Sequence, residues 1–281
     1  MSKESFKQFV KRQEKKLDKA EKMIEEVKED LKIEEFIEKS VKELKKLWEE
    51  NEKRFEDENS IDGLFSFISS LSLPEIPHLL LERTSNKFLK EFDWGKFREF
   101  DWRKFEGRKH LDIDLGLFLS AFLKKNIENY ISSQKEKDIK EENIKPIDIH
   151  LKVKELPVCL DYLGYRNPKK LYLIVEGNLG YRTGAGIEGG EIIVKGNCES
   201  WTGSKMQGGK IIVEGNCGRW AGSDMKSGEL NIKGEVKSFD KSAFSPSNKG
   251  TIILKRTKIW ENGNWTKEGK EMWERGEIPV E

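Results

Sequence analysis

Aliphatic positions in the C-terminal half recur with a period of 19 to 20 residues. Each repeat opens with a short strand pattern of alternating aliphatic side chains, continues through a Gly-Asn pair and closes on small residues. The clear copies span residues 171–190, 191–209 and 210–228, a weaker copy spans 229–250, and another strand pattern begins at Thr251. One apolar strand in every unit of near-constant length predicts a β-solenoid, in which each repeat forms one turn.

Side chains alternate across a strand, so the aliphatic positions of each repeat mark its inward face. Ile192 and Val194 form one such pair, and the equivalent positions of the other repeats are also aliphatic. These equivalents are Leu173, Val175, Ile211, Val213, Leu230, Ile232, Ile252 and Leu254. The outward face carries isoleucine in most repeats but Asn231 in the fourth, so we expect another element to cover it only in the early turns. The pattern predicts a right-handed parallel β-helix of about five turns, a single-stranded solenoid.

Stacked turns place equivalent side chains about 4.8 Å apart, so the sequence predicts side-chain ladders along the solenoid. An amide ladder is expected from Asn178, Asn197 and Asn216. Two further ladders are apolar: Leu179, Cys198, Cys217 and Val236 form one, and Ile187, Met206 and Met225 form the other. The last ladder contains three aromatic side chains in consecutive turns and consists of Arg182, Trp201, Trp220 and Phe239.

The glycine-rich repeat, with its core sequence GGxIIVxGN, resembles the GXGXG-repeat domain at the C-terminus of the glutamate synthase large subunit. It is equally similar to the formylmethanofuran dehydrogenase subunit that is built from the same kind of repeat. The resemblance covers roughly residues 150–256. It implies a right-handed parallel β-helix with a structural, subunit-organising role, while the chemistry lies in other domains or subunits. The N-terminal half carries no such resemblance.

The N-terminal half has helical patterns. Residues 3–58 contain no proline or glycine and carry an incomplete heptad-like apolar stripe, which indicates either a helix packed on its own protein or a coiled-coil dimerisation arm. A repeated Phe-Asp-Trp-x-Lys-Phe motif at 92–97 and 100–105 is expected to pack into a core or an intramolecular interface. Residues 112–130 predict another helix, with one apolar face.

The residues that follow this helix are polar and are expected to link it to the solenoid. Residues 156–166 are expected to cover the N-terminal end of the solenoid, since a repeat array needs caps. The predicted fold class is α+β with several domains. These are a helical domain at 1–131, a polar linker at 132–148, the β-helix at 149–258 and a C-terminal cap or tail at 259–281.

Composition and charge narrow the range of partners. The chain has 281 residues, of which 37% are charged, yet its net charge is +1, so electrostatics give no reason to expect a nucleic-acid partner. No apolar run approaches the ~20 residues that span a membrane, and no segment resembles a signal peptide. Three cysteines without C-x-x-C spacing favour a cytoplasmic protein, and the abundance of lysine and glutamate resembles a thermophile composition.

Candidate chemistry is sparse in the sequence. Histidines occur at His78, His110 and His150, and none is close to a cysteine or to clustered carboxylates. Cys198 and Cys217 fall in adjacent turns, but their ladder also holds aliphatic residues, so we expect buried thiols without metal. The glycine runs match no phosphate-binding loop. We therefore expect no catalytic residue, no metal site and no cofactor, and the chain is not expected to be an enzyme.

The aromatic ladder is the best candidate for an interaction site. Arg182, Trp201, Trp220 and Phe239 lie outside the strand columns, and such an apolar stripe is typical of an interface, although the rings could instead fill a corner of the β-helix. The stripe would hold a protein partner or the chain's own helical domain, and a homo-oligomer stays open. We expect a non-catalytic scaffold that organises partner subunits. The alternative is an accessory subunit of a glutamate synthase-like or formylmethanofuran dehydrogenase-like redox complex.

Overall fold

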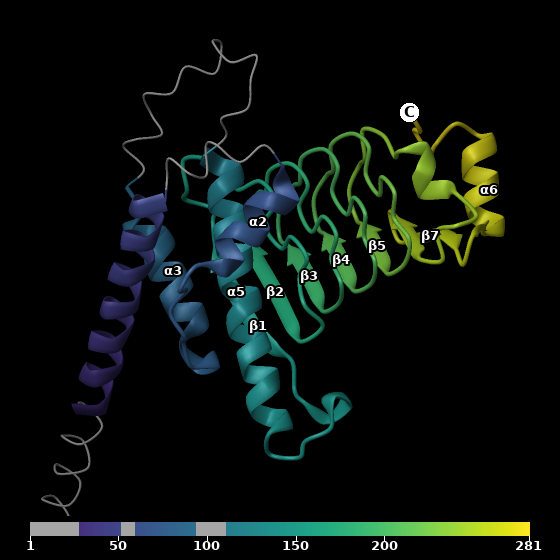
Figure 1. Cartoon of the computed structure of the whole chain (residues 1–281). Helices are drawn as coiled ribbons and strands as arrows, with labels where there is room; N and C mark the ends of the chain where they lie inside the picture. Colours follow the sequence, from purple (N-terminus) through teal and green to yellow (C-terminus); the bar gives the residue numbers. More distant parts are fainter. Residues whose placement is uncertain (1–27, 52–59, 94–110) are drawn as a thin grey trace, which may run out of the picture.

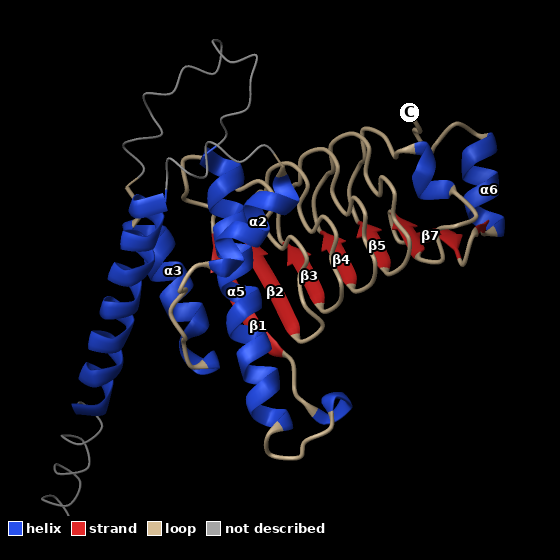
Figure 2. Ribbon diagram, in the orientation of Figure 1, coloured by secondary structure: helices blue, strands red, loops and turns tan. Residues whose placement is uncertain are grey.

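An N-terminal helical region is followed by a β-solenoid of about four turns (Figure 1). The computed structural model describes residues 28–51, 60–93 and 111–281. Residues 28–51 are helical, and the helices that follow are α2 (Ile61–Ser70), η1 (His78–Leu80), α3 (Leu81–Glu91), α5 (Leu111–Lys135) and η3 (Glu141–Asn143). Figure 2 shows that the helices gather at one end of the sheet and that the strands follow one another away from them.

One sheet of eight strands runs in sequence order along the solenoid. The strands are β1 (Ile147–Lys152), β2 (Leu171–Glu176), β3 (Glu191–Val194), β4 (Lys210–Val213), β5 (Glu229–Ile232), β6 (Thr251–Leu254), β7 (Thr257–Glu261) and β8 (Asn264–Trp265). Each strand from β1 to β5 pairs in parallel with the strand that follows it, without a register shift, so β1 to β6 form one parallel array. The predicted parallel solenoid is therefore confirmed for the repeats.

The number of turns is about four, and the prediction of about five was wrong. The repeat that begins at Thr251 forms strand β6 and then stops. Lys255 and Arg256 both have positive φ, 50° and 72°, and connect β6 directly to the antiparallel β7. Positive φ at both central residues is the feature of a type I′ hairpin, which reverses the chain. Neither residue is a typical type I′ residue, so the sequence did not reveal this reversal.

The predicted core positions are confirmed. Ile192, Val194, Ile211 and Val213 are completely buried on the inward face of the sheet. The opposite wall contains a second ladder of parallel bridges, which joins Leu179, Cys198, Cys217 and Val236 in that order. Ile187, Met206 and Met225 are buried between the two walls. Each turn thus closes around its own layer of apolar side chains, as the repeat pattern predicts.

Helix α3 closes the free edge of β1. The Glu82 carboxylate accepts a hydrogen bond from the His150 amide (3.0 Å), and the Asn86 side chain accepts one from the Lys152 amide (2.8 Å). Asn86 also donates to the His150 carbonyl (2.6 Å). Side chains of α3 thereby satisfy backbone groups that would otherwise offer an edge for pairing. Residues 156–166 were expected to cover this end, but they include the loop of the first turn, in which the Tyr162 amide bonds to the Tyr181 carbonyl (2.8 Å).

Helix α5 joins the helical region to the solenoid without a gap. Its residues 115–123 are buried on every side. Gly116 lies so close to the first turn that a Cβ would stand 1.8 Å from the Asp161 carbonyl oxygen. The Ser120 hydroxyl accepts a hydrogen bond from the Gly164 amide (2.9 Å). Both halves therefore share one continuous hydrophobic core.

Helix α5 also extends to Lys135, beyond the predicted helix and into the segment predicted to be a linker. Residues 131–135 include glutamine and lysine, which propagate a helix well despite being polar. The chain leaves the helix near Asp138, which has a φ of 58°. The polar composition of these residues belongs to the exposed end of a helix and not to an extended linker.

The helix of residues 28–51 packs on its own protein. Ile37, Val41 and Leu44 on one of its faces are at most 1% exposed, and the Trp48 ring meets the Phe118 ring edge-on at 5.6 Å. This confirms the intramolecular alternative for the described part of the helix. The stripe before residue 28, and the repeated aromatic motif from residue 94 onward, lie outside the described residues.

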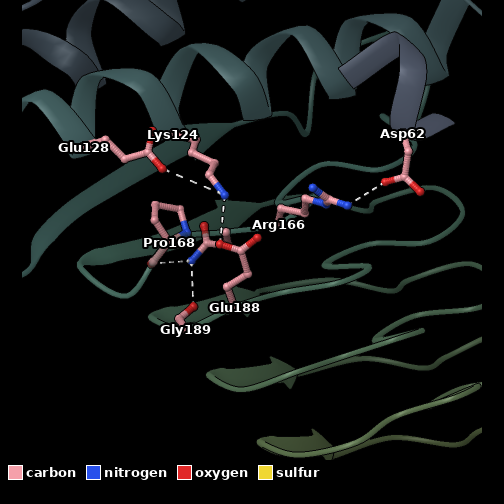
Figure 3. Close-up of polar contacts among 8 residues, drawn as sticks. Asp62, Lys124, Glu128, Arg166, Pro168, Glu188 and Gly189 are labelled. Atoms are coloured by element: carbon pink, nitrogen blue, oxygen red, sulfur yellow. Dashed lines mark hydrogen bonds and ion pairs between the residues drawn. The ribbon is translucent and has the colours of Figure 1, made fainter. Parts of the chain in front are cut away.

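Ion pairs and hydrogen bonds tie the helices to the first two turns (Figure 3). Lys124 on α5 pairs with Glu188 at 2.8 Å, and Arg166 pairs with Asp62 on α2 at 2.8 Å. Asp62 also accepts a hydrogen bond from the Tyr165 hydroxyl at 2.5 Å. Burial and this hydrogen bond raise the pKa of Tyr165 to about 12.

The C-terminal residues close the other end of the solenoid. Strands β7 and β8 and helix α6 (Lys267–Glu274) follow the last turn. The final residues return to the fourth turn, where the Phe239 amide donates to the Pro279 carbonyl (2.8 Å) and the Glu281 amide donates to the Phe239 carbonyl (3.0 Å). The Trp265 ring stacks on Phe244 at 4.3 Å. In the described part of the chain, no helix is long and apolar enough to cross a membrane.

Loss of the α3 side chains should destabilise the solenoid from its first strand. Asn86→Ala removes two hydrogen bonds to β1 and leaves their backbone partners unsatisfied, which we expect to lower the free energy of unfolding by about 1–3 kcal/mol. Urea unfolding measures this loss, and amide hydrogen exchange should accelerate at Lys152. Lys90→Ala, an exposed change on the same helix, is the control and should leave both unchanged. Equal stabilities of the two variants would contradict the edge-closing role of α3.

Alkaline pH should weaken the contact between α2 and the first turn. The pKa of Tyr165 in the folded protein, about 12, exceeds its ordinary value of 10, so the folded state holds this proton more tightly. The stability contribution is complete below pH 10 and is lost as the pH rises through about 12. Tyr165→Phe should remove this part of the alkaline loss, as measured by unfolding at several pH values. Tyr181→Phe, at an exposed tyrosine, should not.

Candidate interaction site

The loops opposite the sheet share an unusual backbone. In each of four consecutive turns, three alternate residues have positive φ. They are Tyr162, Gly164 and Arg166, then Arg182, Gly184 and Gly186, then Trp201, Gly203 and Lys205, and finally Trp220, Gly222 and Asp224. The middle position is always glycine, and a Cβ at Gly184 would lie 2.5 Å from Cδ1 of Ile211 in the core. The glycine spacing of the repeat therefore follows from the backbone of the turn and not from a bound phosphate.

The first of these three positions forms the most notable column of the molecule. Tyr162, Arg182, Trp201 and Trp220 all have φ between 55° and 61°. A side chain in this region costs roughly 1–2 kcal/mol per residue, a cost that glycine avoids. Four large side chains thus occupy positions at which the backbone favours glycine. Such an outlier indicates that the side chains themselves have a role.

These four side chains stack along the solenoid. The Trp201 and Trp220 rings lie nearly parallel, with centroids 4.5 Å apart and 25° between their planes. The Arg182 guanidinium lies 5.1 Å from the Trp201 ring centroid and 5.7 Å from that of Tyr162. Tyr162 is buried beside the helical region, whereas Arg182, Trp201 and Trp220 are half-buried. We call these last three residues the aromatic stripe.

Phe239 was predicted to continue this column, but the structure places it in another one. The amides of Asn197 and Asn216 meet the preceding turn at a spacing of 19 residues, whereas Trp220 meets the hydroxyl of Ser238 at a spacing of 18. Because one residue is missing before Ser238 relative to the preceding turn, Phe239 pairs with the buried Ala221 instead of with Trp220. Phe239 is completely buried against Phe244 and the C-terminal residues, so it contributes nothing to the surface stripe.

Tyr162 was missed by the sequence analysis. It precedes the first recognisable repeat and is followed by a 20-residue interval to Arg182, longer than the spacing of the later turns. The signal that could have found it is the Gly164 that follows two residues later, as in every other turn. The Tyr162 amide bonds to the next turn in the same way as those of Arg182 and Trp201.

The second outer column is polar. It holds Arg166, Gly186, Lys205 and Asp224. Lys205 and Asp224 line a shallow surface depression together with Gln207 and Lys226. Two cations, one carboxylate and one amide here are all exposed, so this depression lacks the enclosure of a small-molecule site.

The asparagine ladder exists, but its bonding differs from the prediction. Asn178 Oδ1 accepts a hydrogen bond from the Asn197 amide, and Asn197 Oδ1 accepts one from the Asn216 amide, each at 2.8 Å. Asn216 continues to the Glu235 amide at 2.8 Å. The side chains bond to the main chain of the next turn instead of to each other. They therefore tie successive corners together, which is a structural role.

The cysteine ladder is also confirmed in its geometry. Cys198 and Cys217 are buried free thiols on adjacent turns. A hydrogen bond to Cys198 and burial hold the pKa of Cys217 well above its usual value, so its thiol stays protonated and is a poor nucleophile or metal ligand. No group of three histidine, cysteine or acidic side chains could hold a metal ion among the residues that the structure describes. That the protein binds no metal remains a prediction.

The two histidines that the structure describes lie on different elements and do not form a site together. The His78 ring packs on Tyr130, with centroids 4.5 Å apart. His150 lies on β1, with its backbone bonded to α3. His110 lies outside the described residues.

Comparisons with known proteins add no assignment. No protein-family model matches the chain, and no curated protein and no solved structure is significantly similar to it. The aromatic stripe must therefore be interpreted from its own geometry.

The stripe predicts an unusual order of stability among variants at one position. Trp201→Ala and Trp201→Gly both remove the ring contact, worth about 0.5–1.5 kcal/mol beyond area burial. Glycine also relieves the positive φ, so we expect Trp201→Gly to be more stable than Trp201→Ala by about 1 kcal/mol in urea unfolding. At the exposed Tyr181, whose φ is not positive, the usual order should hold, with alanine the more stable. The same order at both positions would contradict this account of the stripe.

Proposed function

We propose that this chain is a non-catalytic scaffold protein that organises partner subunits, and that the aromatic stripe is the surface that binds one of them. The observation that carries the proposal is the continuous stack of Arg182, Trp201 and Trp220 at backbone positions that favour glycine. In three neighbouring turns, a large and partly exposed side chain occupies a position where its positive φ lowers the stability of the backbone. Tryptophan and arginine are the residue types enriched at the centres of protein interfaces.

The stacking geometry favours a protein partner over a sugar or a nucleotide. Carbohydrates and bases bind to the flat face of an aromatic ring, but the facing sides of Trp201 and Trp220 cover each other, and Arg182 lies over the other face of Trp201. All three side chains are only half-buried, so part of each remains accessible. A row of three such side chains suits a protein surface of similar length, and a row of three turns is about 10 Å long.

The helical region is not the partner of the stripe in the described part of the chain. Phe118 and Phe122, two large apolar side chains of α5, are fully buried and therefore not free to cover it. The described helical contacts reach the first turns through Gly116, Ser120 and Asp62. This leaves a separate protein as the partner that we propose.

The alternative proposal is an accessory subunit of a glutamate synthase-like or formylmethanofuran dehydrogenase-like redox complex. It rests on the resemblance of the repeats to the GXGXG domain, in which the β-helix is right-handed. A G-x-G-x-G sequence places glycine at alternate residues, and glycine adopts positive φ readily. Four consecutive turns of this chain have positive φ at alternate residues. Right-handed crossovers are also the rule for parallel strands.

Purification of the tagged chain from its native cells tests the proposal. A stoichiometric partner should co-purify with the wild type, and the separately purified partner should bind the Trp201→Gly/Trp220→Gly variant at least tenfold more weakly. Glycine suits the backbone at both positions, so the variant should keep its fold, which circular dichroism checks. Lys226→Ala, in the surface depression beside the polar column, is the control and should bind normally.

Two results would overturn the proposal. One is equal binding of the partner to the double variant, and the other is a wild-type chain that co-purifies with nothing in stoichiometric amount. Iron, molybdenum, tungsten or flavin in the purified complex would favour the redox alternative. A complex without them would favour the plain scaffold.

A further inference from the structure

The outer face of the sheet carries a regular pattern of charge. Each strand presents three outward positions, a first, a central and a third. The third position is the residue directly after the strand in the middle of the sheet, where the three positions are Glu191, Ile193 and Lys195 for β3, Lys210, Ile212 and Glu214 for β4, and Glu229, Asn231 and Lys233 for β5. The first and third positions have opposite charge on each of these strands. Strand β1 follows the same rule with Asp148 and Lys152, and no strand from β1 to β6 has like charges in these two positions.

The central row of this face consists of isoleucines except for His150 on β1 and Asn231 on β5, and it lacks a cover among the described residues. Ile174, Ile193, Ile212 and Ile253 are half-buried, but they belong neither to the hydrophobic core nor to the side chains packed on it. We expected another element to cover the outward face of the early turns, and among the described residues none does. The helices gather at the β1 end, and strands β3 to β5 extend beyond them (Figure 2).

Ion pairs within one chain explain the charges only in part. Along the solenoid, Lys210 pairs with Glu191 at 3.9 Å and with Glu229 at 3.3 Å, and Lys233 pairs with Glu214 at 3.0 Å. These pairs require that the sign alternates along each row. They do not require the two rows to be opposite on the same strand, nor do they explain the isoleucines between them.

We propose that this face is the interface of a homodimer, in which a second copy packs sheet against sheet about a two-fold axis parallel to the solenoid. This axis makes each strand antiparallel to the same strand of the second copy. It sets the first position of one copy against the third position of the other. Glu191 then faces Lys195, Lys210 faces Glu214, and Glu229 faces Lys233, so opposite charges meet on all three strands. The isoleucines meet each other in the centre.

The same pattern fixes the register of the dimer. In this alignment Asn231 faces Asn231 of the second copy, and the two amides can bond to each other. A slip by one strand would set Glu229 against Glu214 and Asn231 against Ile212. It would thus bring like charges together and bury an unpaired amide, each of which disfavours association. An unrelated partner would need the same alternating pattern by coincidence, whereas a second copy has it by symmetry.

The size of the face indicates a weak dimer. Six strands spaced about 4.8 Å apart, each presenting five residues of about 3.3 Å, make a patch of roughly 25 by 15 Å. This is on the order of 400 Å² in projection, small beside the ~800 Å² that each partner buries in a stable interface. The dimer should therefore dissociate on dilution.

Sedimentation of the full chain at concentrations from about 1 µM to about 1 mM tests this interface. The wild type should shift from monomer toward dimer across this range. Lys195→Glu sets two pairs of carboxylates against each other and should weaken the dimer at least tenfold. The exchange variant Glu191→Lys/Lys195→Glu restores opposite charges between copies, although it disrupts pairing within the row, and should recover the dimer. A purely intramolecular role of these charges predicts no such recovery.

Further variants separate this inference from the proposed function, on which it does not rest. Ile193→Asp should make the chain monomeric, with circular dichroism and thermal unfolding showing that it still folds. Trp201→Gly/Trp220→Gly should leave the dimer intact, because the stripe lies on the loops and not on the sheet. A wild type that stays monomeric at about 1 mM would overturn the inference. So would a dimer that survives Ile193→Asp, or a failure of the exchange variant to recover association.

Discussion

In-register stacking of the turns is the constraint on which the rest of this structure depends. Strands β1 to β6 pair in parallel without a shift, so each residue lies directly over its counterpart in the next turn. A residue type suits such a position only if it tolerates a copy of itself at about 4.8 Å. Aliphatic side chains pack on their copies in the core, asparagines bond to the main chain of the next turn, and Trp201 and Trp220 stack on each other. On the outer sheet face, neighbouring charges alternate in sign and form ion pairs.

A stack of this kind has two ends at which its hydrogen bonds have no partner. At the first strand, two side chains of α3 take the place of a further strand. At the last, the chain reverses into β7 and its final residues return to Phe239. Closed ends prevent edge-to-edge growth, so a partner has access to the sides of the solenoid. The helical region thus closes one end of the solenoid and shares its hydrophobic core.

The two proposed binding surfaces use different sides of the solenoid. The aromatic stripe lies on the loops, where positive φ makes large side chains costly and therefore informative. The sheet face combines a central row made mostly of isoleucines with two flanking rows, in which the charges alternate along the solenoid and are opposite on the same strand. A chain that dimerises through its sheet would present two aromatic stripes on outer surfaces, so the two proposals are compatible. Together they describe a scaffold that could hold two copies of its partner.

The sequence by itself determined the solenoid, its inward residues and most of its ladders, because each of these depends on a short pattern that recurs in every turn. Ile192, Cys198 and Trp201 could be placed from spacing. Only the tertiary structure showed the features that occur once in the molecule. These are the missing residue that moves Phe239 inward, the chain reversal after β6, and the α3 cap on β1. Asn86 lies 64 and 66 residues from its partners on β1, and such a single long-range contact leaves no periodic signal in the sequence. A local preference that recurs in every turn can be recognised in the sequence. A contact that occurs once can be recognised only in the folded chain, which brings its residues together.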